Sequence, residues 1–310
     1  MLYIAEAEVR SLLPMSEAVR LMGETFQALA AGTAVNQSRR RMMVPGGAVL
    51  HAMAGAAGQY FGTKIYSVQA KHGAYFFFHL FDSTTAKPLA IIEANYLGQI
   101  RTGAASGYAT DLLSRKDAKI LGVIGSGFQA RAQLEAILEF RKLEQVRVWS
   151  RDPQRRENFA KECSDACGVP VIAVGTAEEA VKRADIVVTA TSSKDPVIDC
   201  AWIAPGTHIN AMGSNWAHRR ELPAELIERA DLIAVDSIEQ SKLEAGDLIL
   251  AWTADDWNTP RLIELKDASG VERAAGAITI FKSNGLGVED VTAGAYVYEQ
   301  AMKKKLGREL

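Results

Sequence analysis

Residues 119–130 read KILGVIGSGFQA, an apolar strand that runs into a Gly-x-Gly-x-x-Ala turn at the start of a helix. Gly125 permits the tight turn, and Gly127 lets the backbone approach a pyrophosphate. Ala130 is small enough for the helix to pack on the strand, and the helix N-terminus supplies amide donors for an anion. The pattern alone would also fit a structural turn of another α/β fold. Its position between a strand and a helix predicts a dinucleotide-binding unit.

Strands and helices alternate along the chain beyond this turn. Strands are expected at 118–125, 146–150, 170–174, 186–191, 208–213 and 232–235, with helices at 129–140, 154–167 and 177–183. Nearly continuous apolar strands separated by helices are typical of a parallel sheet that is covered on both faces. We therefore expect an α/β Rossmann-type doubly wound sheet over residues 114–287.

The N-terminal part has a different pattern. An amphipathic helix at 14–31 precedes short strands separated by turn residues, which indicates an antiparallel meander. These strands are expected at 41–44, 49–53, 60–68, 75–82 and 88–93, followed by a helix rich in small residues at 98–113. A last helix is expected at 289–305. We expect residues 1–113 and 288–310 to form an α+β domain that the C-terminal helix completes.

The composition excludes several classes of protein. Of the 310 residues, 48% are hydrophobic and 23% are charged, and the net charge of −2 gives no bulk attraction to nucleic acid or to an acidic membrane. No apolar stretch approaches the roughly 18–20 residues of a membrane span, and the N-terminus does not resemble a signal peptide. The three cysteines are too few for a disulfide framework, and Cys163 and Cys167 lack a second ligand pair. We expect a cytoplasmic protein without a metal site.

The second strand of the α/β domain should end near the adenosine ribose of the cofactor. An Asp or Glu at that place usually holds the ribose of NAD(H). Here the strand ends in Ser150-Arg151, a hydroxyl and a guanidinium suited to a 2′-phosphate, so we expect NADP(H). In the alternative, Arg151 is a solvated turn residue and Asp152 holds the ribose, which would allow NAD(H).

Two more segments, Thr191-Ser192 and Met212-Gly213, each follow a strand. They lie at the edge of the sheet where ligands dock in open α/β sheets. They are candidates to line the nicotinamide, although each could be an ordinary loop. The residues expected from the sequence pattern to contact the cofactor are Gly125, Ser126, Gly127, Gln129, Ala130, Ser150, Arg151, Thr191, Ser192, Met212 and Gly213.

Four segments together resemble the ornithine cyclodeaminase/mu-crystallin family. They are QIRTGAAS at 99–106, the glycine turn at 125–130, INAMGS at 209–214 and FKSNGLGVED at 281–290. The family contains ornithine and lysine cyclodeaminases, archaeal-type alanine dehydrogenases, and ketimine or cyclic-imine reductases. The resemblance implies a homodimer built through an N-terminal substrate-binding and dimerisation domain, followed by the Rossmann domain.

The resemblance also implies a grip on a substrate carboxylate by Arg41, Lys64 and Arg101. Two guanidiniums and an ammonium can neutralise and orient an α-carboxylate. Arg41 alone would fit a solvated arginine run. Lys64 lies in an apolar strand and Arg101 in a small-residue helix, where an idle charge is costly. Thr102, in the same motif, is expected to contact the cofactor.

One position departs from the cyclodeaminase pattern. Cyclodeaminases of this family carry an Asp that handles the substrate amines, and this chain has Asn215 there. An amide cannot serve as a base near neutral pH, whereas reduction of an imine does not need one. We therefore expect an oxidoreductase that transfers hydride from NAD(P)H to a small imino acid. The alternatives are an ornithine cyclodeaminase, an alanine dehydrogenase-like enzyme and a non-enzymatic binding protein.

The expected substrates are cyclic ketimines such as Δ1-pyrroline-2-carboxylate or Δ1-piperideine-2-carboxylate, or imines of 2-oxo acids, and the expected products are L-amino acids. The proton donor stays open among Lys64, His51, His79 and a bound water. His79 lies in an apolar strand, where a packed core histidine is expected.

Overall fold

The computed structural model describes all residues from 1 to 310 and divides them into two compact units. The first unit holds residues 1–104 and 285–310, and the second holds residues 105–284. Each unit contains one β-sheet, and the division falls within helix α3 (Asn95–Leu113).

The sheet of the first unit has seven strands in the order β15-β1-β6-β5-β4-β3-β2. Strands β2 to β6 form the antiparallel meander that the turn residues predicted, and β1 pairs parallel with β6. The strands are β1 (Leu2–Ile4), β2 (Ala34–Met43), β3 (Val49–Ala57), β4 (Tyr60–Gln69), β5 (Gly73–Asp82), β6 (Pro88–Glu93) and β15 (Arg308–Glu309). The predicted start of β2 at residue 41 was wrong by seven residues.

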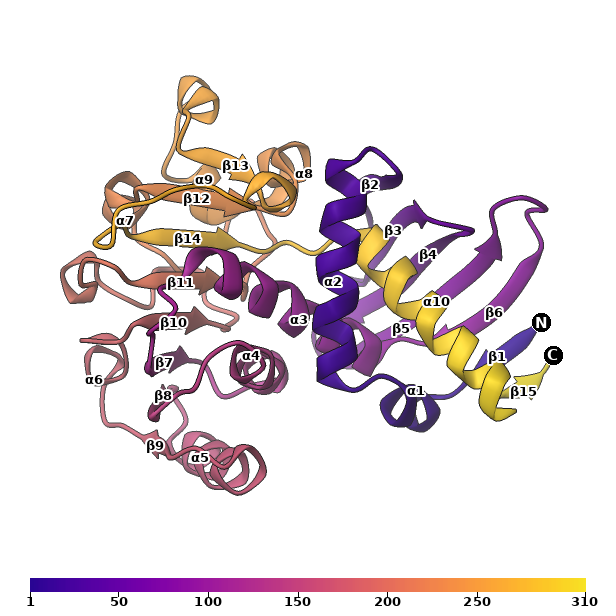
Figure 1. Cartoon of the computed structure of the whole chain (residues 1–310), viewed down its shortest axis with the longest axis horizontal. Helices are drawn as coiled ribbons and strands as arrows, with labels where there is room; N and C mark the ends of the chain where they lie inside the picture. Colours follow the sequence, from indigo (N-terminus) through magenta and orange to yellow (C-terminus); the bar gives the residue numbers. More distant parts are fainter. The chain divides into compact units, whose positions relative to one another are not determined.

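Three helices accompany this sheet: α1 (Glu6–Leu12), α2 (Met15–Ala30) and α10 (Gly287–Lys304). Helix α10 crosses strands β3 and β4 and contacts α2, so the last segment of the chain covers one face of the first sheet (Figure 1). That face is apolar over β5 and β6, where Phe78, Leu80 and Ile92 are fully buried. The first turn of α10 lies against β3, since a Cβ added at Gly287 would lie 2.5 Å from the carbonyl oxygen of Ala54.

The sheet of the second unit has eight strands, all parallel, in the order β13-β12-β14-β11-β10-β7-β8-β9. The strands are β7 (Ile120–Ile124), β8 (Gln145–Trp149), β9 (Val171–Ala173), β10 (Ile186–Thr189), β11 (His208–Ala211), β12 (Leu232–Val235), β13 (Leu262–Glu264) and β14 (Thr279–Lys282). The chain starts in the middle at β7, runs outward to β9 and returns to β10 on the other side of β7. This reversal is the topological switch of a doubly wound sheet, and the predicted fold class is confirmed.

The helices of this unit are α4 (Phe128–Leu138), α5 (Pro153–Cys167), α6 (Ala177–Val181), α7 (Ala224–Arg229), α8 (Ile238–Glu244) and α9 (Gly246–Ile249). They leave the strands buried on both faces. Val123 and Val188 belong to one core cluster, and Ile124 and Val187 belong to the other. Strands β13 and β14 and helices α7, α8 and α9 escaped prediction.

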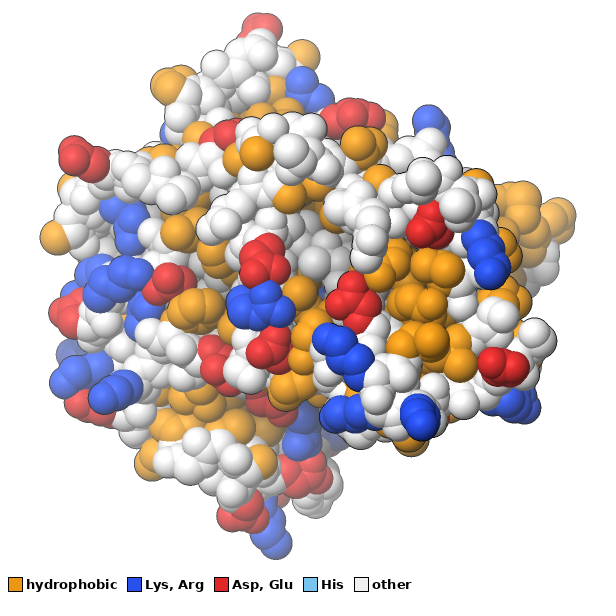
Figure 2. Space-filling model, turned by 45° about the vertical axis from the view of Figure 1, so that its right-hand side comes forward, with side chains coloured by type: hydrophobic (Ala, Val, Ile, Leu, Met, Phe, Trp, Pro, Cys, Tyr) orange, Lys and Arg blue, Asp and Glu red, His pale blue; other side chains and the backbone are white.

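Acidic and basic side chains are scattered together over the face of the molecule drawn in Figure 2. This mixture agrees with the small net charge of −2. None of the helices is both long enough and apolar enough to span a membrane.

Candidate active site

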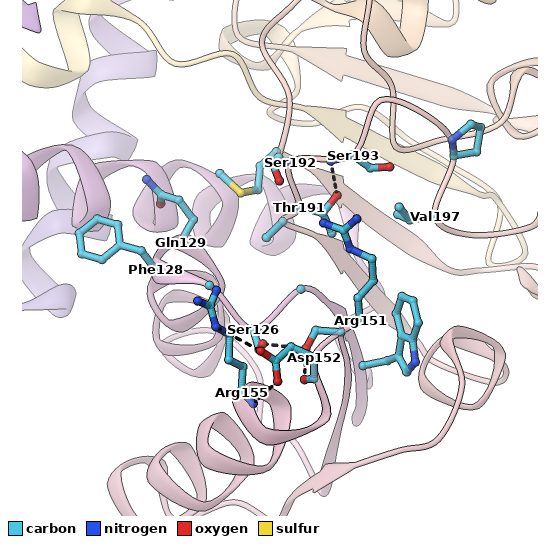
Figure 3. A pocket seen from close by; sticks show the side chains of 18 residues that line it. Ser126, Phe128, Gln129, Arg151, Asp152, Arg155, Thr191, Ser192, Ser193 and Val197 are labelled. Atoms are coloured by element: carbon cyan, nitrogen blue, oxygen red, sulfur yellow. Dashed lines mark hydrogen bonds and ion pairs between the residues drawn. The ribbon is translucent and has the colours of Figure 1, made fainter. Parts of the chain in front are cut away.

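The second unit contains a cavity of about 680 Å³ at the carboxyl ends of β7, β8, β10 and β11. It lies at the switch point between β7 and β10, where parallel α/β sheets bind ligands. Figure 3 shows Asp152 and Arg155 near Ser126, the side chain of Arg151 extending toward Thr191, and Phe128 and Gln129 at another part of the wall. The lining residues are Gly125, Ser126, Gly127, Phe128, Gln129, Trp149, Ser150, Arg151, Asp152, Arg155, Ala190, Thr191, Ser192, Ser193, Pro196, Val197, Met212 and Gly213.

The glycine turn fits a diphosphate. Gly125 has φ of +112°, and a Cβ there would lie 2.4 Å from the carbonyl oxygen of Ala190. Around Gly127 no atom lies within 4 Å of an added Cβ, so the backbone is open on that side. Gly127 is also the N-cap of α4 and gives the helix no side-chain cap. The first amides of α4 therefore offer an anion the donors that a capping side chain would otherwise engage.

Two guanidiniums beyond the end of β8 belong to the pocket wall. Arg151 and Arg155 are both exposed and line the cavity. Asp152 caps α5, because its carboxylate accepts a hydrogen bond of 3.1 Å from the backbone nitrogen of Arg155. The hydroxyl of Ser126 donates to that of Ser150 over 2.8 Å. The carboxylate of Asp152, which could hold a ribose diol, is therefore engaged as the cap of α5.

Most of the residues that the sequence assigned to the cofactor line this cavity. Ala130 does not, because it is fully buried in the core beneath α4. Thr102 lies in the first unit, where its hydroxyl donates to the carbonyl of Gly98 over 2.7 Å. The cofactor contacts of both stay predictions. Asp152, which the sequence offered as the alternative ribose contact, also lines the cavity. The lining residues that sequence reasoning missed are Phe128, Trp149, Arg155, Ala190, Ser193, Pro196 and Val197.

The first unit holds a buried network of charges. Lys64 and Arg101 are 3% and 5% exposed. Both bind Asp290, with 2.8 Å from Lys64 Nζ and 3.1 Å from Arg101 Nε to Oδ1. Arg101 also donates from Nη1 to Glu289 over 2.6 Å. Both acids come from the first turn of α10 and stand at the end of the FKSNGLGVED motif, and no role in the site was predicted for them from the sequence.

Two arginines of β2 lie near this network, since the charges of Arg41, Arg39 and Lys64 all act on His51 of β3. Arg41 is half-buried and pairs with His51 of β3 in the sheet register. A β-bulge between Gln37 and Arg40 shifts the strand, and Arg39 is 6% exposed with Nη2 3.4 Å from the carbonyl of Gly285. Sequence reasoning missed Arg39.

We call Arg39, Arg41, Lys64 and Arg101 the cationic cluster. Its three arginines alone outnumber the carboxylates Glu289 and Asp290, which leaves an excess of positive charge suited to an additional carboxylate.

The pKa values around the cluster separate the candidate proton donors. Burial, with help from Arg101, lowers the pKa of Lys64 to about 7, while Asp290 acts against this shift. Burial and the charge of Arg41 lower the pKa of His51 to about 3. His51 is therefore neutral near pH 7 and stacks on Tyr66, with ring centroids 4.2 Å apart. Lys64 can hold or release a proton in the neutral range, and His51 cannot.

His79 does not lie where the sequence suggested. In the β4–β5 register Lys64 pairs with Phe78, whereas His79 pairs with Thr63, so His79 points to the opposite face of the sheet. It is half-buried rather than packed in the core. The expectation of a core histidine was wrong, because the period of two along β5 places Phe78 and Leu80 inward instead.

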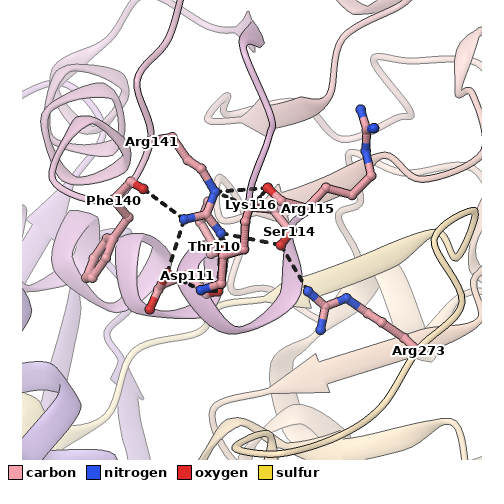
Figure 4. Close-up of polar contacts among 8 residues, drawn as sticks. All are labelled: Thr110, Asp111, Ser114, Arg115, Lys116, Phe140, Arg141 and Arg273. Carbon is pink, nitrogen blue, oxygen red and sulfur yellow. Dashed lines mark hydrogen bonds and ion pairs between the residues drawn. The ribbon is translucent and has the colours of Figure 1, made fainter.

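Helix α3, which carries Arg101, is anchored at its far end by Arg141. This guanidinium is 4% exposed and donates to the last carbonyls of the helix region, at 3.0 Å from Thr110 and 3.3 Å from Ser114 (Figure 4). It also contacts the carboxylate of Asp111 over 3.1 Å. These bonds satisfy carbonyls that a helix C-terminus leaves without partners.

Replacing Arg141 by methionine should lower the free energy of unfolding by about 2–4 kcal/mol, since several buried carbonyls lose charged donors. Urea denaturation followed by circular dichroism measures the change. Lys116→Met is the matched control, because Lys116 binds the same Asp111 from a position that is 71% exposed. The control should change stability by about 0.5 kcal/mol or less. Equal effects of the two variants would contradict the capping role of Arg141.

No group of His, Cys, Asp or Glu side chains is arranged to hold a metal ion. Cys163 is buried, and burial raises the pKa of its thiol to about 11. This thiol is therefore protonated and unreactive near neutral pH.

The parallel sheet, the glycine turn and the cavity at the switch point define a dinucleotide-binding protein of the Rossmann class. The family model for the ornithine cyclodeaminase/mu-crystallin family matches residues 2–305. The chain belongs to that family.

Three proteins illustrate the similarity. A Δ1-pyrroline-2-carboxylate reductase of Bacillus cereus is 36% identical over 236 residues, which cover 74% of this chain and 72% of the relative. The Δ1-pyrroline-2-carboxylate reductase of Thermococcus litoralis, solved with NADH and L-proline, has a TM-score of 0.93 and 31% identity over the full length of both chains. An archaeal alanine dehydrogenase dimer with bound NAD has a TM-score of 0.94 and 30% identity, covering 100% of this chain and 98% of that one.

Proposed function

We propose that the protein is an NAD(P)H-dependent reductase of small imino acids, with Δ1-pyrroline-2-carboxylate as its first candidate substrate. The observation that carries the proposal is the buried cationic cluster, in which Lys64 has a pKa of about 7. An excess of positive charge suits a carboxylate, and a lysine that titrates near neutrality suits proton transfer. The similarity to Δ1-pyrroline-2-carboxylate reductases supports the same substrate class.

The chemistry requires a hydride at the imine carbon and a proton at the imine nitrogen, so that C=N becomes CH–NH. A nicotinamide cofactor held by the residues that line the cavity would supply the hydride. Arg41 and Arg101 hold the substrate carboxylate, and Lys64 gives its proton to the nitrogen. Asp290 keeps Lys64 and Arg101 in fixed positions through its two short contacts. Orienting the reactants in this way can contribute about 7–11 kcal/mol to lowering the barrier.

The amide at position 215 favours reduction over cyclodeamination. Asn215 is half-buried in the loop that follows β11. The family resemblance assigns an acid to this position in cyclodeaminases, and an amide cannot take its place as a base. The same amide is compatible with Δ1-piperideine-2-carboxylate and with imines of 2-oxo acids as substrates.

The function is tested by following NADPH and NADH oxidation with a panel of imines. The panel contains Δ1-pyrroline-2-carboxylate, Δ1-piperideine-2-carboxylate, and pyruvate with ammonia or methylamine. We expect the first substrate to be reduced to L-proline, identified by chiral chromatography. Ammonia released from L-ornithine without net cofactor turnover would identify a cyclodeaminase instead. Turnover confined to pyruvate with ammonia would identify an alanine dehydrogenase, and no turnover on any substrate would contradict the proposal.

We propose that NADP(H) is the preferred cofactor. Arg151 and Arg155 stand at the adenosine end, and the carboxylate of Asp152 is engaged as the cap of α5. The double variant Arg151→Ala/Arg155→Ala should raise KM for NADPH about 10- to 100-fold, since bonds to charged groups are worth about 1.5–3 kcal/mol. KM for NADH should change little. Steady-state kinetics measures KM for NADPH and KM for NADH in the wild type and in the variant. A parallel rise of both KM values would argue against recognition of a 2′-phosphate.

We propose that two copies of the chain associate through the outer face of the first sheet. Leu50, Tyr75 and Phe77 are exposed on this face, at 38%, 64% and 38%. Phe77 lies on the opposite side of β5 from Phe78, which pairs with Lys64. Large exposed apolar side chains on one face favour association, and the similar archaeal alanine dehydrogenase is a dimer.

Light scattering after size exclusion should give about twice the chain mass of 33.6 kDa. Phe77→Asp should shift this mass toward the monomer, because it places a charge within the apolar face. A wild-type protein that is monomeric at high concentration would contradict the proposal.

A further inference from the structure

A buried carboxylate, Glu221, lies behind the cofactor pocket and has no part in the proposed chemistry. Its side chain is fully buried and accepts hydrogen bonds of 2.7 and 2.6 Å from the backbone nitrogen and the hydroxyl of Thr191. It accepts a third bond of 2.8 Å from the backbone nitrogen of Gly213. Thr191 follows β10 and Gly213 follows β11, and both line the cavity. One carboxylate therefore ties together two loops of the pocket wall.

The two loops are in close contact through their backbones. A Cβ added at Gly213 would lie 2.4 Å from the backbone nitrogen and oxygen of Thr191 and 2.5 Å from Oε1 of Glu221. No side chain fits at this position, so the separation of the loops depends on the carboxylate and on the glycine. A small change at Glu221 should therefore be transmitted to the lining of the pocket.

A second layer of buried charges fixes Glu221 itself. Asp247 accepts hydrogen bonds of 2.6 and 2.9 Å from the backbone nitrogens of Glu221 and Leu222. Lys282, from strand β14, lies 3.1 Å from Asp247 and donates to the carbonyl of Ser214. Burial and the nearby Asp247 raise the pKa of Glu221, while the donors of Thr191 lower it. The two backbone amides and the hydroxyl that donate to its oxygens match the acceptor-only character of an ionised carboxylate.

We propose that Glu221 is a positioning residue of the cofactor pocket, which sets the spacing of the loops after β10 and β11 and thereby the affinity for the nicotinamide half of the dinucleotide. This inference rests on the proposed cofactor. In a doubly wound sheet the adenosine half binds on the β8 side of the switch point, and the other half binds on the side of β10 and β11. Glu221 acts only on the second side.

The variant Glu221→Gln keeps the size of the side chain but replaces one acceptor oxygen by a donor group. One of the backbone amides of Thr191 and Gly213 then faces another donor, and the loops must separate. Calorimetric titration with NADPH and NADH should show about a 10-fold rise in Kd for the cofactor that the wild type binds, as for a lost buried bond to a charged group. Adenosine 2′,5′-bisphosphate and ADP represent the adenosine halves of NADP(H) and NAD(H). Titration of the variant with each of them should give the Kd of the wild type.

Glu264→Gln is the matched control, because Glu264 accepts a hydrogen bond of 2.8 Å from the backbone nitrogen of Ile238 away from the pocket. Its Kd values should equal those of the wild type. If Glu221→Gln does not fold, Thr191→Val removes one donor at similar volume and should raise Kd about threefold in the same selective way.

An unchanged Kd for the cofactor in Glu221→Gln would overturn the inference. An equal rise in Kd for the whole cofactor and for its adenosine half would also overturn it. A wild type that binds neither NADPH nor NADH would instead contradict the proposed function.

Discussion

Arg101→Met is expected to lower kcat/KM for Δ1-pyrroline-2-carboxylate by about 100- to 1000-fold, because truncating one member of a buried charged pair costs about 2–5 kcal/mol. The guanidinium is 5% exposed and lies between Glu289 and Asp290, in the position from which we propose that it holds the substrate carboxylate. Methionine has a similar reach but no charge. Steady-state kinetics with saturating cofactor measures the loss, which should appear mainly in KM for the imine.

The same change should also reduce stability. Without Arg101, Asp290 keeps its ion pair of 2.8 Å with Lys64, whereas Glu289 loses the ion pair of 2.6 Å that Arg101 made with it. Breaking such a network costs about 3–5 kcal/mol of unfolding free energy. Arg101→Lys separates the two effects, because it keeps the charge and loses the planar fork. It should recover much of the stability and little of the activity.

A surface arginine serves as the control for the loss of a positive charge. Arg20 is 48% exposed and pairs with Glu17 and Glu24 on α2. Arg20→Met should leave kcat/KM unchanged and alter stability by about 1 kcal/mol or less. A folded Arg101→Met variant with wild-type kcat/KM would remove the carboxylate grip from the mechanism.

The sequence predicted those parts of the site whose residues are neighbours in the chain. The strand β7 and the glycine turn lie within twelve consecutive residues, and each residue type there has a backbone reason. The acids of α10 could not be found in this way. Glu289 and Asp290 stand about 190 residues from Arg101 in the chain, and only the packing of α10 on the first sheet brings them together.

Two other features depend on the tertiary structure. Strand β14 (Thr279–Lys282) is too short to show a period, and it enters the sheet between β11 and β12 although it follows both in the chain. The burial of Arg39 depends on the bulge in β2, which changes the side to which successive residues point. From the sequence alone, the arginine run at 39–41 therefore resembled a solvated segment.

Lys64→Met is expected to lower kcat for imine reduction by about 100- to 10 000-fold, which is the range that general acid catalysis contributes. In the wild type, burial and Arg101 lower the pKa of Lys64 to about 7. If its ammonium supplies the proton, kcat/KM should fall about tenfold for each pH unit above this value, since only the protonated form is active. Rate measurements between pH 5.5 and about 9.5 test this slope.

Loss of structure at high pH cannot produce that decline through Lys64. Its pKa in the folded protein lies below the ordinary 10.5, so between about pH 7 and 10.5 the unfolded chain binds more protons than the folded one. The contribution of Lys64 to the free energy of unfolding therefore rises with pH in this window, while the activity falls.

Lys64→Arg distinguishes the enzyme from the substrate as the titrating group, because arginine stays protonated throughout the range. A residual activity without the decline above pH 7 would assign the proton to Lys64. The same decline in Lys64→Arg would mean that the imine itself titrates and that Lys64 only contributes charge.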